Sequence, residues 1–101
     1  MDTNAKILDI AMNLNRIGNW AADDYDAKRG RIKTFLGNTT TYIQSLDISA
    51  FPTSFAETFR DFTKDYSSLE KEGLNHPKDP IYWAEKMMTW GNILTHRSKL
   101  V

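Results

Sequence analysis

The feature that most constrains the fold is the stretch from residue 3 to residue 46, which contains no proline. Its apolar residues recur at helical spacing in two runs, the first ending at Ala21 and the second beginning at Ile32. Projected onto one uninterrupted helix, both runs point the same way: Ile7, Ile10, Ala11, Leu14, Ile17 and Ala21, then Ile32, Phe35, Leu36, Thr39, Ile43 and Leu46. A turn would normally reset this phase, so the coincidence favours a continuous helix.

The opposing interpretation is a reversal near Asp23 and Asp24. Asn19, Asp23 and Asp24 are residue types that cap a new helix. The chain would then form an all-α, up-and-down four-helix bundle over a single domain of residues 1–101, because all four helices have similar lengths. These helices are predicted at about 3–22, 25–46, 54–72 and 80–99.

The continuous alternative is one long helix over 3–46 followed by a helical hairpin. Such a helix would be roughly 66 Å long, about twice the length of its partners. Half of its apolar stripe would need a second chain, which makes this alternative a dimeric bundle with coiled-coil-like packing. Its dimer contacts would include Ile32, Phe35, Leu36 and Ile43. Both interpretations remain open at the level of sequence.

The two downstream helices carry clear boundary signals. Ser54 and Glu57 have the spacing of a capping box, and Gly73 is predicted to stop the third helix in a left-handed conformation. Asp79 is predicted to cap the last helix, with Pro80 at its first position. The expected core faces are Phe55, Phe59, Phe62, Tyr66 and Leu69, then Trp83, Ala84, Met87, Trp90, Gly91 and Leu94.

Three glycines, Gly18, Gly37 and Gly91, are each followed by asparagine and lie in or beside the apolar stripes. Glycine inside a helix costs about 1 kcal/mol relative to alanine, which demands a compensating gain. We expect these glycines to be packing notches that a neighbouring side chain fills.

Composition excludes several functions. The chain has no cysteine, and its 13 basic and 13 acidic residues cancel, which argues against a nucleic-acid binder steered by net charge. No signal-peptide pattern or run of about 18 apolar residues is present, so a cytoplasmic protein with no membrane contact is expected. The two histidines and the acidic cluster Asp23, Asp24 and Asp26 lack metal-ligand spacing, so neither metal nor cofactor is expected.

No catalytic motif is present, and we expect a protein that acts by protein–protein contact and self-associates as a homodimer. The candidate partner surface is an apolar strip on the outer side of the last helix: Tyr82, Thr89, Ile93 and Leu100. One alternative is a weak anion or nucleic-acid binder that uses the basic residues Lys28, Arg29, Arg31 and Lys33. Another is an enzyme or ligand-binding bundle with its tryptophans around the glycine notches.

Overall fold

The computed structural model describes residues 2–101, which are almost entirely helical. Three α-helices are joined by short connections: α1 (Thr3–Gln44), α2 (Thr53–Leu74) and α3 (Pro80–Arg97). Two 3₁₀ turns, η1 (Ile48–Ala50) and η2 (Ser98–Leu100), precede α2 and follow α3. The described residues contain no strand, which confirms the all-α class.

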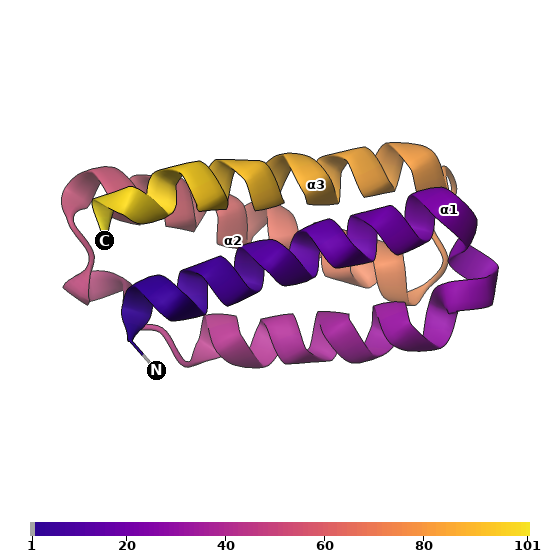
Figure 1. The fold of residues 1–101 in the computed structure, drawn as a ribbon, viewed down its shortest axis with the longest axis horizontal. Coiled ribbons are helices and arrows are strands. Elements are labelled where there is room, and N and C mark those ends of the chain that lie inside the picture. Colours follow the sequence, from indigo (N-terminus) through magenta and orange to yellow (C-terminus); the bar gives the residue numbers. More distant parts are fainter. Residues whose placement is uncertain (1) are drawn as a thin grey trace.

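The expectation of four helices is wrong in its count, because residues 3–44 form the single element α1. The straight-rod alternative is wrong as well. Asp24 has an extended backbone inside α1, with φ −162° and ψ 94°, and the longest dimension of the molecule is 38 Å. Figure 1 shows that α1 folds back at this kink, so its first arm (3–23) and second arm (25–44) run in opposite directions.

The kink is stabilised by its own acidic residues. Asp24 Oδ1 accepts a hydrogen bond of 3.1 Å from the backbone amide of Ala27, so Asp24 caps the second arm as the sequence predicted. Asp23 instead pairs with Lys28, whose Nζ lies 2.6 Å from Asp23 Oδ2. One carboxylate therefore starts the second arm, while the other remains on the surface.

The boundaries of α2 differ from both predictions. The helix begins at Thr53, and Pro52 supplies no side-chain cap, so the capping box at Ser54 does not form. The carbonyl of Pro52 already accepts hydrogen bonds from the amides of Phe55 and Ala56, which starts the helix earlier than Ser54 could cap it. Gly73 does not stop the helix either, because it is a buried residue inside the last turn.

The start of α3 is confirmed. Asp79 Oδ1 accepts a 3.0 Å hydrogen bond from the amide of Tyr82, and Pro80 occupies the first helical turn. At the other end of the molecule, Asn4 Nδ2 donates a 2.8 Å hydrogen bond to the carbonyl of Ser98. Both chain ends therefore lie together, opposite the kink (Figure 1).

One hydrophobic core joins both arms of α1 to α2 and α3. Ile32 and Leu36 have no exposed surface, so the stripe of the second arm is covered within one chain instead of across a dimer. Phe35 and Ile43 are half-buried against the same core. The largest fully buried side chains are Ile7, Ile10, Leu14, Ile17, Ile32, Leu36, Phe55, Phe59, Phe62, Trp83, Met87 and Leu94.

Two of the three expected glycine notches are confirmed between α1 and α3. A Cβ at Gly18 would lie 2.4 Å from Met88 Cγ, and one at Gly91 would lie 2.8 Å from the amide group of Asn15. The expectation was wrong for Gly37, where a Cβ would meet nothing within 4 Å. Gly37 lies on the exposed face of the second arm, so no neighbouring segment packs against it.

Candidate functional site

A groove runs along the outer side of α2 and α3. Its apolar lining comes from Leu69 of α2 and from Tyr82, Trp90 and Ile93 of α3. The three α3 residues are eight and three positions apart, which keeps them on one face of the helix. Tyr82 is 48% exposed, so a large aromatic ring is open to solvent.

Trp90 links this groove to the core. Its ring centroid lies 5.5 Å from that of Phe62, a fully buried residue of α2. Its indole Nε1 donates a hydrogen bond of 3.3 Å to Asp65 Oδ2 at the groove edge. The indole is therefore held in one orientation, with part of its surface facing the groove.

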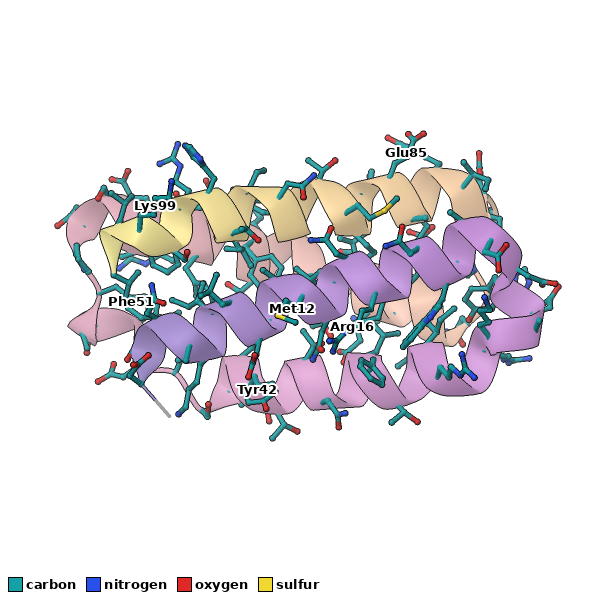
Figure 2. All side chains as sticks on the ribbon, in the orientation of Figure 1. Met12, Arg16, Tyr42, Phe51, Glu85 and Lys99 are labelled. Carbon is teal, nitrogen blue, oxygen red and sulfur yellow. The ribbon has the colours of Figure 1, made fainter. Side chains whose placement is uncertain are left out.

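The rim of the groove is acidic. Asp65 and Glu72 of α2 and Glu85 of α3 line it, together with one base, Lys86. Three carboxylates and one ammonium leave two net negative charges on the lining. Lys86 Nζ lies 4.9 Å from the ring centroid of Tyr82, a cation–π contact that covers part of the exposed ring. Figure 2 shows Glu85 projecting outward from α3, away from α1.

The structure brings together three of the four predicted surface residues. Tyr82, Thr89 and Ile93 all line the groove. Leu100 does not, because it lies in η2 beside His96, Arg97 and Lys99. The final turn of the chain changes from α to 3₁₀ geometry after Arg97, so a projection as one helix misplaces Leu100.

Sequence reasoning missed half of the groove. The polar face of α2 gives no apolar signal, yet Asp65 and Glu72 form one rim. Trp90 was predicted as a core residue, and it is half-buried. Trp90 follows Trp83 by seven residues, a spacing that predicts the same face of the helix. That spacing does not indicate how much of the Trp90 ring stays exposed.

The four candidate anion-binding residues do not form one site. Lys28 pairs with Asp23, and this contact lowers the pKa of the Asp23 carboxyl through a hydrogen bond and charge attraction. The guanidinium of Arg31 lies 5.9 Å from the ring of Trp20. Arg29 and Lys33 are exposed on the second arm and take part in no salt bridge within residues 2–101.

The glycine notches leave no open space for a ligand, because Met88 and Asn15 occupy them. Within residues 2–101, no group of three or more histidine, aspartate or glutamate side chains is arranged to hold a metal ion. Over the same residues, no helix has the length and apolar content needed to cross a bilayer.

His76 contacts the second arm of α1 near the kink. Its Nε2 lies 2.9 Å from Asp26 Oδ1, and its Nδ1 lies 3.0 Å from the carbonyl of Pro77. Its ring also meets the ring of Tyr25 at 4.7 Å. His76 therefore links the connection between α2 and α3 to the second arm of α1.

Comparisons of this chain with protein-family models, with curated proteins and with solved structures found no match.

Proposed function

We propose that this protein is a non-catalytic interaction module that associates with a second copy of itself through the groove between α2 and α3. The observation that carries the proposal is the combination of a partly exposed apolar lining with an acidic rim on one surface. Apolar area supplies most of the free energy of protein association, and rim charges select the partner.

The surface that fits this groove lies on the second arm of α1. Gly30, Lys33 and Gly37 recur at spacings of three and four and are exposed, and Arg29 is exposed beside them. We call these four residues the basic ridge. A Cβ at Gly30 or Gly37 would meet nothing within 4 Å, so an aromatic side chain of another molecule has room to approach the backbone there.

Charge supports a second copy as the partner. The chain has no net charge, yet acids gather around the groove and bases on the ridge. A ridge that packs into the groove of another copy brings Arg29 and Lys33 near carboxylates such as Glu72 and Glu85. Two such contacts around a twofold axis would close a homodimer.

Mass measurement by light scattering on a size-exclusion column tests the proposal. We expect a concentration-dependent shift from the chain mass of 11.6 kDa toward twice that value, weakened by added salt. A groove variant, Glu72→Lys with Glu85→Lys, and a ridge variant, Arg29→Glu with Lys33→Glu, should each be monomeric alone. An equimolar mixture of the two should associate again, because each retains the partner surface that the other needs.

The matched control reverses one exposed arginine and one exposed lysine outside both surfaces, Arg60→Glu with Lys99→Glu. This control should associate like the parent. A parent protein that stays at 11.6 kDa at every concentration would rule out the second copy as the partner. A dimer that both charge reversals leave intact would place the interface elsewhere.

A further inference from the structure

A second groove lies between the two arms of α1 and shares no residue with the first. Asp9, Met12, Asn13 and Arg16 line it from the first arm, and Asn38 and Tyr42 from the second. Figure 2 shows Met12 in the middle of the first arm, with Arg16 toward the kink and Tyr42 toward the opposite end. The groove therefore has a basic end near the kink and an acidic end near Tyr42.

Asn13 is the informative residue. It is 7% exposed, yet its amide has no hydrogen-bond partner among residues 2–101. Every fully buried side-chain nitrogen or oxygen of these residues has a hydrogen-bond partner. Because the amide of Asn13 has none, its nitrogen and oxygen must keep some accessible area, and this area faces the groove that Asn13 lines. The side chain is thus mostly buried while its amide stays open to the groove, where it offers two N–H donors and one acceptor to a ligand.

The charged groups at the two ends are similarly uncommitted. In the described part of the chain, neither Asp9 nor Arg16 takes part in a salt bridge. They are seven residues apart on one face of the arm, which separates them by about 10 Å along the helix axis. Asn38 adds a second amide on the opposite wall.

We propose that this groove binds a short peptide with two free termini, about three residues long. An extended tripeptide spans about 10 Å, which matches the separation of Asp9 and Arg16. The terminal ammonium would meet Asp9 and the ring of Tyr42, and the terminal carboxylate would meet Arg16 and Asn38. A side-chain amide matches a peptide unit in both donor and acceptor, so Asn13 would pair with a backbone amide in the middle.

Nuclear magnetic resonance on the ¹⁵N-labelled full chain, titrated with trialanine, tests this site. We expect saturable shifts of the side-chain amide signals of Asn13 and Asn38 and of the Arg16 Nε–H. Trialanine that is acetylated at one end and amidated at the other should bind at least about tenfold more weakly, because it lacks both charges. Equal binding of the two peptides, or no saturable shift, would overturn the proposal.

Substitutions separate the two ends of the groove. The second peptide for this test is trialanine amidated at its C-terminus only, which keeps its terminal ammonium. Arg16→Gln should weaken the binding of trialanine by about tenfold and leave the affinity for the amidated peptide unchanged. Asn13→Leu should weaken both peptides, while Asn92→Leu on the exposed side of α3 should weaken neither. If Arg16→Gln weakens both peptides equally, the carboxylate is not recognised at that end and the proposal fails.

Discussion

The phenolic hydroxyl of Tyr25 donates a hydrogen bond to the backbone carbonyl of Gly73, which ties the kink of α1 to the last turn of α2. Because α2 ends one residue later, that carbonyl has no partner further along the helix. Tyr25 is 3% exposed, and its burial raises the pKa of its hydroxyl. Tyr25, which directly follows the kink, thus supplies the hydrogen-bond donor that the Gly73 carbonyl lacks at the end of α2.

Tyr25→Phe should therefore destabilise the fold by about 1–3 kcal/mol, since it leaves the Gly73 carbonyl without a partner while keeping the ring. Urea denaturation followed by tryptophan fluorescence measures this free energy. Tyr82→Phe, at a half-exposed position, is the control and should change stability by less than about 0.5 kcal/mol. A loss no larger for Tyr25→Phe than for the control would contradict the assigned role of this hydrogen bond.

Gly73→Ala and Gly37→Ala should have opposite effects although both glycines lie inside helices. A Cβ at Gly73 would lie 2.4 Å from Trp83 Cζ2, and that indole is held by a 2.9 Å hydrogen bond from its Nε1 to the carbonyl of Leu69. We expect a loss of about 1–3 kcal/mol at Gly73 from overpacking. At Gly37 we expect a gain of about 0.5–1 kcal/mol, because nothing opposes the better helix propensity of alanine.

Thermal or urea denaturation of these two variants gives the comparison directly. A gain at both positions would mean that Trp83 moves aside, and the packing described for Gly73 would be incorrect. A loss at both positions would contradict the gain expected at Gly37.

Asp24→Ala should favour a straight α1. The substitution removes the cap of the second arm, at a cost of about 1 kcal/mol, and adds helix propensity at the kink. A straightened α1 would separate its two arms, so two chains would have to exchange them to cover the core. We expect a larger fraction of dimer by light scattering, insensitive to salt because the exchanged contacts are apolar.

The matched control for this variant is Asp23→Ala, which removes only the exposed pair with Lys28. It should remain as monomeric as the parent protein at the same concentration. Equal dimer fractions in both variants would show that the cap at Asp24 does not control the reversal.

Tyr66 should make the fold sensitive to alkaline pH. Burial, mainly, and the nearby Glu70 carboxylate raise the pKa of Tyr66 well above its ordinary value. Its hydroxyl donates a 3.0 Å hydrogen bond to the carbonyl of Leu36, which needs the protonated form. The protonated hydroxyl of Tyr66 contributes fully to the free energy of unfolding below about pH 10. This contribution is lost as pH rises further, because the unfolded chain then releases a proton that the folded chain keeps.

Above pH 10 this residue should contribute a loss of about 1.4 kcal/mol per pH unit to the free energy of unfolding. Tyr66→Phe should remove that part of the slope, although the variant is less stable at neutral pH. Urea titrations between pH 8 and pH 11 measure both effects. An unchanged slope would mean that Tyr66 ionises without unfolding, contrary to its burial.

The sequence alone determined the helical class, the core stripes, the cap at Asp79 and the role of two glycines. These features depend on helical periodicity and on contacts between near neighbours, which a linear pattern records. The kink residue was also among the predicted caps, because aspartate pairs with a free amide three positions along the chain.

Only the tertiary structure decided the reversal, the role of Gly73 and the two grooves. The phase of the apolar stripe favoured a continuous helix, whereas the structure folds α1 back at Asp24 and covers Ile32 and Leu36 fully within one chain. Gly73 was predicted to end its helix, yet it lies inside the helix because the ring of Trp83 fills the space that a side chain would take. The grooves combine residues of two helical segments that are far apart in sequence, and no local pattern encodes which exposed faces become neighbours.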